Sequence, residues 1–585
     1  MRRVLRGSVW AAAMATSLLL TGSTARAQKR PKKAAPVAQS SGPVDMDADQ
    51  PAAPVARPAS PAKRAVDNSS GAAATAGTPS EAATQAKHLY EKEKYWDAAK
   101  ALFRVYSGET GDDAGNKEIA QFDLAKTLYK LKFFQASYSI FSEIADKPNH
   151  LKYNETLLWL AKLATDLPEP ADIIERVGKY NEEHVAKFNN KEQAELYWQL
   201  NYLLGRYRYR NGQFPEALTL FEKVNRKSRY YVEAQFFGGI SNVQLRQSKP
   251  AVQGFQRIIG AVEEGDVPSE DEARFRDLAY LSMARTFYSA SIRVDDTTNQ
   301  PTVDQTRLSA AVKYWNKVDV ASEYWLDALF EESWAYFMAG DYSHALGNIH
   351  TIQAPYFPHS YYPEADVLKA VIYFSNCQYD DALTIVAKFR SQYDPIRTEL
   401  TKTLERFQKG ANQEEAFYKF LKDVRDDKAQ LDPKIAPIVK TSLSDRQLLR
   451  NLEYVRLLDE EESRFKKAPA AFKQSKVADL VSDSVHDARA LAVRNAGDLA
   501  RGRYQRNLED LSEQLRNGQK ILIDITAAKR NELDQAIQGS QVTMEESKAN
   551  IVKPDEEHVI WPYNGEYWRD ELGFYRQTIT SKCGR

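Results

Sequence analysis

Side chains suited to catalysis or metal binding are scattered through this sequence. The most closely spaced histidines, His344, His350 and His359, lack the His-x3-His spacing that places two ring nitrogens on one helical face as metal ligands. No Gly-x4-Gly-Lys-Ser/Thr phosphate loop occurs, and Gly238-Gly239 lacks the third glycine and preceding strand of a dinucleotide-binding loop. We therefore predict no catalytic, cofactor-binding or metal site.

Carboxylates occur as sequence neighbours at Glu331-Glu332, Asp380-Asp381 and Glu460-Glu461-Glu462. Neighbouring side chains on a helix point about 100° apart, so such a pair does not flank one reacting bond. We expect these groups to form solvated helix faces, and the protein not to be an enzyme. The weakest of our three functional hypotheses is an enzyme with an unrecognised site in the C-terminal helices.

The sequence has two cysteines, Cys377 and Cys583. They allow one intramolecular bridge, which would tie the last residues to the middle of the chain and would suit an oxidising compartment. The alternative is two free thiols, one buried and one exposed. The sequence leaves both open.

A pattern of small and bulky residues returns after 34 positions: Gly205, Ala217 and Phe221 recur as Gly239, Ala251 and Phe255. Small residues allow helices to cross closely, and aromatic rings fill the groove between them. With Leu204-Gly205 on a first helix and 211–217 as turn and second-helix start, the pattern resembles the tetratricopeptide repeat (TPR) family. The resemblance implies paired helices stacked into an α-solenoid that binds proteins.

Further copies of the apolar, small, bulky spacing extend this array in both directions. The copies begin at Trp96, Phe134, Leu308, Tyr342 and Tyr379. The segment 153–180 is a degenerate copy interrupted by Pro168 and Pro170, and 293–306 is expected to be a loop insertion.

The predicted fold class is all-α: a TPR-type solenoid, then long helices, then an aromatic-rich end. The predicted divisions are a signal peptide at 1–27, a disordered Ala/Pro-rich tether at 28–80, the repeat array at 81–395, a long-helix or coiled-coil region at 396–540 and a C-terminal segment at 541–585.

The N-terminal residues indicate export. Arg2 and Arg3 precede an apolar run at 9–20, and Ala25-Arg26-Ala27 offers a small-x-small cleavage site. No later run reaches the roughly 20 apolar residues of a spanning helix. We therefore expect a periplasmic or outer-membrane-associated protein without a transmembrane span after cleavage.

No proline lies between Pro469 and Gly539, which predicts one or two long helices. Leu515 and Leu522 have the heptad spacing of a coiled coil, with Gly518 as a weak point between them. Such a seam would support self-association; the alternative is amphipathic helices folded against each other or against the array.

A helical array offers a concave groove to a partner. The candidate partner-binding residues are polar or aromatic positions on first helices and in the aromatic C-terminal segment: Asn201, Arg208, Gln235, Asn242, Tyr336, Tyr373, Trp561, Tyr567 and Trp568. The alternatives are that the groove positions pack between units, and that the C-terminal segment is a flap over the helical region.

Lysine plus arginine number 80 and aspartate plus glutamate number 80, so no basic excess indicates nucleic acid. The first hypothesis is a non-catalytic envelope scaffold that binds protein partners. The layout resembles envelope TPR proteins of Gram-negative bacteria, including those of the myxobacterial gliding-motility machinery, which implies motility or envelope biogenesis. The second hypothesis is a cell-wall or polysaccharide assembly factor that binds glycan.

Overall fold

The computed structural model describes residues 75–266, 269–294, 301–358, 360–407, 412–426, 428–429, 431–432, 435–436, 438–439, 446–537 and 559–583. The predicted signal peptide, the tether up to residue 74 and the central part of the predicted 293–306 insertion lie outside these residues. None of the described helices is long and apolar enough to cross a membrane.

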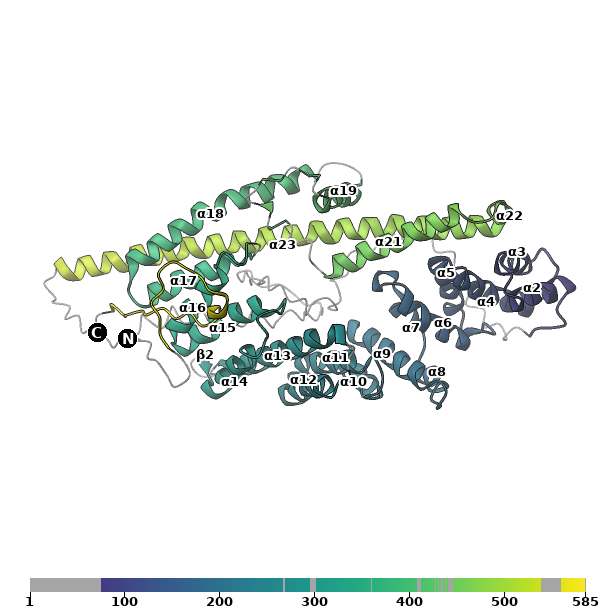
Figure 1. Ribbon diagram of the computed structural model, residues 1–585, viewed down its shortest axis with the longest axis horizontal. Coiled ribbons are helices and arrows are strands. Elements are labelled where there is room, and N and C mark those ends of the chain that lie inside the picture. The colour runs from purple at the N-terminus through teal and green to yellow at the C-terminus, as the bar shows by residue number, and fades with distance from the viewer. Residues whose placement is uncertain are drawn as a thin grey trace, which may run out of the picture.

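The described chain is a stack of helix pairs followed by a long return helix, which confirms the all-α repeat fold (Figure 1). Each first helix turns back into a second helix, and successive pairs pack on one another. The pairs are α2 (Glu81–Glu91) with α3 (Tyr95–Tyr106), α4 (Ala114–Lys130) with α5 (Phe134–Ala145), α9 (Ala194–Arg210) with α10 (Phe214–Phe221), α11 (Tyr231–Gln244) with α12 (Ser248–Glu263), α13 (Ser269–Ser291) with α14 (Gln305–Trp315), α15 (Trp325–Ala339) with α16 (Tyr342–Ile352), and α17 (Pro363–Ser375) with α18 (Tyr379–Arg406).

The predicted degenerate copy is broken where its prolines fall. Helix α6 (Tyr153–Asp166) ends before Pro168, and Pro170 lies at the start of the 3-10 turn η1 (Glu169–Ala171). Two single-turn helices follow, α7 (Ile173–Val177) and α8 (Glu182–Ala186). A proline cannot donate a backbone hydrogen bond, so no full second helix forms here.

The two 34-residue copies cross as their residue types predicted. A Cβ built on Gly205 of α9 would lie 2.6 Å from Phe221, and one on Gly239 of α11 would lie 2.5 Å from Phe255. Both rings are buried. Only glycine lets each ring lie directly on the backbone of the preceding helix.

In six of the seven pairs that the structure describes, the turn between the two helices uses one left-handed residue. Gly212 and Gly340 fill this position with φ of +70° and +77°. In the other turns the same position has a side chain, and its φ lies between 54° and 63°: Glu93, Lys132, Arg246 and Cys377. A left-handed non-glycine residue costs on the order of 1 kcal/mol, which the packed helix pairs offset.

The insertion after α13 begins and ends in a short antiparallel strand pair rather than in loop alone. Strand β1 (Ile292–Val294) pairs with β2 (Pro301–Val303), with Ile292 opposite Val303.

Helix α18 passes the expected array boundary and continues through Pro395 to Arg406. It is followed by α19 (Gln413–Arg425), α21 (Arg446–Lys466), α22 (Ala470–Lys473) and α23 (Lys476–Ile537). The 62 residues of α23 form one helix, about 93 Å long at 1.5 Å per residue. This confirms the predicted long helix.

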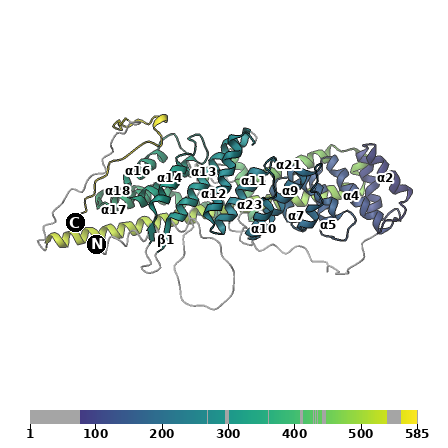
Figure 2. The same cartoon turned by 90° about the horizontal axis from the view of Figure 1, so that it is seen from below.

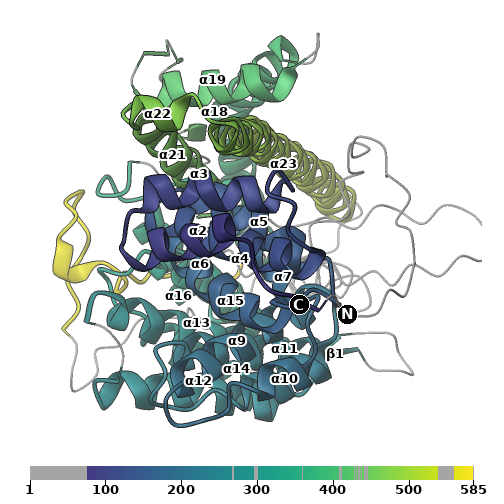
Figure 3. The same cartoon turned by 90° about the vertical axis from the view of Figure 1, so that its right-hand side faces the viewer.

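Helix α23 joins the two ends of the stack. It packs against α3 and α5 near one end and against α17 and α18 near the other. Figures 1 and 2 show the stack and α23 extending along the same long axis, and Figure 3 shows them end-on. We call α21, α22 and α23 the return helices.

The apolar seam of α23 is covered by its own chain. Leu511, Leu515 and Ile525 share a buried cluster with residues of α18. At the predicted weak point, a Cβ built on Gly518 would lie 3.3 Å from the ring of Phe389. This ring of α18 therefore fills the space that a larger side chain at position 518 would occupy. The structure therefore has the amphipathic helix folded against the array, and self-association stays a prediction.

Replacement of Gly239 by alanine tests the close helix crossing. The added methyl group overpacks against Phe255, and we expect a loss of about 1–3 kcal/mol. In hydrogen exchange, the amides of α11 and α12 should lose protection by roughly tenfold or more.

Gly260→Ala in α12 is the matched control, because a Cβ there meets nothing within 4 Å. It should keep or increase protection, since alanine favours helix by up to about 1 kcal/mol. Equal losses in both variants would contradict the crossing as the cause.

Candidate functional site

Two of the predicted groove residues on α9 and α11 lie inside the stack. The Asn201 side chain is 1% exposed and donates to the Tyr197 carbonyl, and Gln235 is 8% exposed and accepts from Arg257 at 3.0 Å. Arg208 and Asn242 are half-buried and bond to Gln213 and to the Gly238 carbonyl. Their role in partner binding stays a prediction, with little free surface at Asn201 and Gln235.

The other two groove residues, Tyr336 on α15 and Tyr373 on α17, lie beside the C-terminal segment. The Tyr373 hydroxyl accepts a hydrogen bond of 2.6 Å from the Gln577 side chain. The Tyr336 ring stacks on His344 at 4.7 Å between centroids, and its hydroxyl lies in the electrostatic field of Arg576. Sequence positions more than 200 apart are thus brought together.

Residues 567–583, here called the strap, run over α16 and on to the turn between α17 and α18 (yellow in Figures 1 and 3). The strap passes the residues of α16 in reverse order. Its contacts are Tyr356 to the Tyr567 carbonyl, Gly573 to Thr351, Gln577 to the Ser343 carbonyl, Gln378 to the Thr580 carbonyl and Lys582 to the Asn376 carbonyl. These residues cover the last repeats, as the flap alternative expects, and docking of a partner on the exposed Trp568 stays a prediction.

A disulfide fixes the end of the strap. Cys377 and Cys583 are bonded, with their Cα atoms 5.0 Å apart. Of the two alternatives that the sequence left open, the structure has the intramolecular bridge. Cys377 occupies the left-handed turn position between α17 and α18.

Gly347, in the middle of α16, lets the strap lie directly on the helix backbone. A Cβ at this position would be 1.7 Å from the Tyr575 carbonyl oxygen. Glycine inside a helix destabilises it by about 1 kcal/mol relative to alanine. The close contact with the strap backbone explains why a glycine is nevertheless found at position 347. The sequence analysis missed this residue, although an isolated glycine within a helical pattern was a visible signal.

Three strap side chains enter the array, and all were missed from the sequence. Leu572 is 5% exposed and shares a buried cluster with Trp325 and Leu329. Ile579 is 5% exposed and joins Trp334, Ala345 and Leu368 in one buried cluster. Arg576 is half-buried in the field of Glu332, Tyr336 and Asp341. The pKa of the Arg576 guanidinium is lowered by burial and raised again by these neighbours, with a net decrease.

The expectation that neighbouring carboxylates form solvated faces is wrong for Glu331, Glu332 and Glu461, which are at most 8% exposed. Glu331 pairs with Arg285 and accepts a hydrogen bond from the Trp315 indole at 3.2 Å. Glu332 accepts from Asn348 at 2.8 Å, and Glu461 from the Gln135 amide at 3.0 Å. Each has a polar partner from another helix, which the sequence spacing does not reveal. Asp380 is exposed, as expected.

The C-terminal segment also surrounds His350 with rings, two from the strap and one from Tyr563, which precedes it. Tyr563, Tyr567 and Tyr575 lie 4.7 to 5.0 Å from its ring centroid. Burial, with a smaller effect of Lys369, lowers the pKa of His350, which favours the neutral ring. No group of His, Cys, Asp or Glu within the described residues could hold a metal ion, and His359 lies outside those residues.

The aromatic residues of the C-terminal segment divide between buried and exposed. Tyr567 is half-buried against His350, whereas Trp561 is 77% and Trp568 57% exposed. Phe574 is also exposed. The predicted tryptophans are therefore available to a partner, and their role in binding stays a prediction.

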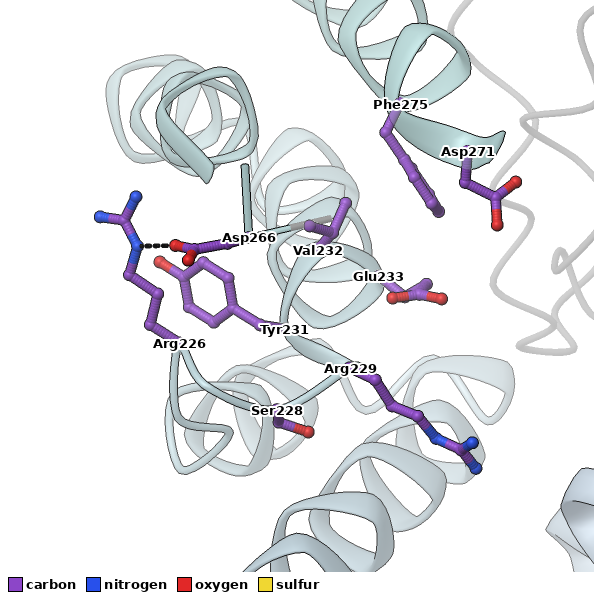
Figure 4. Close-up of a pocket in the computed structure, with 9 residues that line it drawn as sticks. All are labelled: Arg226, Ser228, Arg229, Tyr231, Val232, Glu233, Asp266, Asp271 and Phe275. Carbon is purple, nitrogen blue, oxygen red and sulfur yellow. Dashed lines mark hydrogen bonds and ion pairs between the residues drawn. The ribbon is translucent and has the colours of Figure 1, made fainter. Parts of the chain in front are cut away.

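Figure 4 shows a hollow between α11 and the start of α13. Its volume is about 40 Å³, and Arg226 on its edge donates to Asp266 at 2.7 Å. Ligand pockets usually measure about 300–1,000 Å³, so this hollow has room for water and not for a substrate. A second hollow of about 270 Å³ lies between α18 and residues Asp432 and Ile435.

No protein-family model matches this sequence, and no curated protein matches it. Similar solved structures include one titled "Crystal structure of APC/C hetero-tetramer Cut9-Hcn1", at 12% identity over 75% of this chain and 78% of that chain, with a TM-score of 0.21. Another is a circular tandem repeat protein with novel repeat topology and enhanced subunit contact surfaces, at 11% identity over 79% of this chain and 90% of that chain, with a TM-score of 0.11. These TM-scores are too low to define a shared fold, so the TPR-like architecture rests on the helix pairs described above.

Three carboxyl groups around α15 and α17 should make local stability depend on pH. Burial raises the pKa of Asp327, Glu332 and Glu364 to about 7. For Glu364 the nearby charges of Asp510 and Glu513 on α23 raise it further. Because the folded state binds these protons more tightly than the unfolded state, it is favoured at low pH and loses this advantage as pH rises through about 7.

We therefore expect the thermal stability of α15–α17 to fall between about pH 4 and about pH 7. Glu364→Gln should flatten this dependence, since glutamine keeps the shape and removes the charge that faces α23. Glu222→Gln in an exposed position is the control. A Glu364→Gln protein with the full native pH slope would contradict the assignment.

Proposed function

We propose that this protein is a non-catalytic scaffold of the cell envelope that binds protein partners on its TPR-like stack. The observation that carries the proposal is the contact between the stack and the strap. The surface of α15, α16 and α17 holds a protein segment through backbone hydrogen bonds and the buried side chains of Leu572 and Ile579.

A scaffold role also suits the rest of the described chain. The helix pairs present large side surfaces for side-by-side protein contacts. The exposed Trp561 and Trp568 are of the residue types that anchor protein interfaces.

The export pattern at 1–27 supports an envelope location, periplasmic or at the outer membrane. We propose that the protein belongs to a multiprotein envelope complex of the kind that serves motility or envelope biogenesis. This step rests on the sequence layout. Direct glycan binding is the competing outcome of the experiment below.

The experiment is affinity purification of the tagged, exported full chain from crosslinked envelopes. Defined proteins that copurify should then bind the purified full chain in reconstitution. Binding to purified sacculi or glycan, without any protein partner, would overturn the protein-scaffold function in favour of glycan assembly.

The double substitution Trp561→Ala and Trp568→Ala should weaken partner binding by at least about tenfold, since exposed tryptophans are frequent interface anchors. Its melting temperature should stay within about 1 °C of the native value, because neither ring is in the core. Trp315→Ala, at a ring only 2% exposed, is the opposite control and should lower the melting temperature strongly. Unchanged binding by the double variant would remove these two residues from the interface.

A further inference from the structure

The strap shows what kind of segment the α15–α17 surface recognises. We propose that this surface is a binding groove for an extended peptide that carries an arginine and, three residues later, an aliphatic residue. The strap occupies it as an internal ligand, and the Cys377–Cys583 disulfide holds it there. The inference rests on the proposed scaffold function and specifies the partner's chemistry.

The arginine position is defined by groups that remain on the array. Glu332 is 2% exposed, and one of its carboxylate oxygens has no hydrogen-bond partner. Arg576 lies in the electrostatic field of Glu332 and Asp341. Its guanidinium donates to the strap's own Tyr575 carbonyl at 2.8 Å, so the arginine charge acts on Glu332 through space. A buried carboxylate with no cation beside it is costly, so the surface favours a guanidinium over a neutral side chain.

The aliphatic position is a buried apolar cluster. Ile579 packs with side chains from three helices, including Trp334 on α15, Leu346 on α16 and Ile372 on α17. Burial of this apolar side chain stabilises the bound strap. The strap places Arg576 and Ile579 three residues apart, and a partner segment needs the same spacing to reach both positions.

The backbone contacts specify a turn at Gly573, where φ is +89°, followed by an extended conformation. Gly573 and Gln577 donate their amides to Thr351 and to the Ser343 carbonyl, and Gly347 leaves room for the intervening peptide group. The Gln577 contact needs only an extended backbone, whereas the Gly573 contact needs a turn with positive φ, which favours glycine in a partner segment as well. The arginine and the aliphatic residue supply the rest of the selectivity.

The disulfide makes replacement of the strap conditional. A segment tethered to the same chain has an effective concentration in the millimolar range, and a covalent bond at its end raises the barrier to release further. A dithiol reductant opens the bond in two exchanges. Its first thiolate attacks one cysteine sulfur, which forms a mixed disulfide and releases the other cysteine. Its second thiolate then attacks the reductant's own sulfur in the mixed disulfide and releases the remaining cysteine. The reductant gives up two electrons and ends as a disulfide, and Cys377 and Cys583 become thiols.

The test uses a labelled synthetic peptide with the sequence of residues 570–583 and serine in place of Cys583. The recipient is the full chain with Cys377→Ser, Cys583→Ser, Arg576→Ala and Ile579→Ala, which weakens the strap and leaves the groove intact. Fluorescence anisotropy should show saturable binding. The oxidised native chain should bind at least about tenfold more weakly, because its groove is occupied.

Two matched controls define the recognition. A peptide with Arg576→Ala should bind at least about tenfold more weakly than the native-sequence peptide, and Glu332→Gln in the recipient should reduce that difference. Gly347→Ala in the recipient should also reduce binding. Equal binding of both peptides, or no binding to a recipient whose circular dichroism is native, would overturn the proposal and leave the strap as a structural cover.

Gly347→Ala in the otherwise native chain is a second test that does not depend on the multiple variant. After reduction with dithiothreitol, residues 573–579 should exchange amide hydrogens at least about tenfold faster than in the equally reduced native chain. An unchanged exchange rate would contradict the packing of the strap on Gly347. Both tests need only purified protein, so failure to recover envelope partners and failure of peptide binding are separate results.

Discussion

The length of one helix constrains the rest of this structure. A continuous helix of 62 residues is a rod of about 93 Å, and both of its ends pack on the repeat stack. The distance between the first pairs, at α3 and α5, and the last pairs, at α17 and α18, is therefore fixed by α23. A repeat stack in which each pair contacts only its neighbours can bend along its length, whereas α23 restrains this stack at both ends.

The brace is specific because its contacts combine burial with charge. Burial alone would raise the pKa of Glu169, but Arg206 and Arg210 of α9 and Arg450 of α21 hold it below its usual value. Tyr454 of α21 donates to Gln135 of α5 at 2.6 Å, and Gly497 of α23 lets its helix approach the Glu414 carbonyl of α19 closely. The return helices thus cover surfaces of the stack that an open spiral would offer to a partner. The strap covers another, at the opposite end from α3.

The repeat period and the glycine–aromatic crossings could be predicted because they depend on residues close in sequence. The turns at Glu93 and Lys132 were harder to recognise, because packing forces ordinary residues into the left-handed conformation that glycine marks elsewhere. The surfaces on which the strap and the return helices pack could not be predicted, because their contacts join residues hundreds of positions apart in the sequence. The hydrogen bond between Tyr454 and Gln135 is an example. The burial of Glu332 and Glu461 has the same origin: their partners come from other helices.

The most direct measurement of the brace is zero-length carbodiimide crosslinking of the full chain, followed by mass spectrometry. Lys476 at the start of α23 lies 2.8 Å from Glu109 after α3, and Lys529 near its end lies 2.6 Å from Asp380 on α18. The structure predicts both crosslinks within one molecule, as a mixture of isotope-labelled and unlabelled chains would reveal. Recovery of only one of them, or of both only between different molecules, would contradict a helix that braces its own stack.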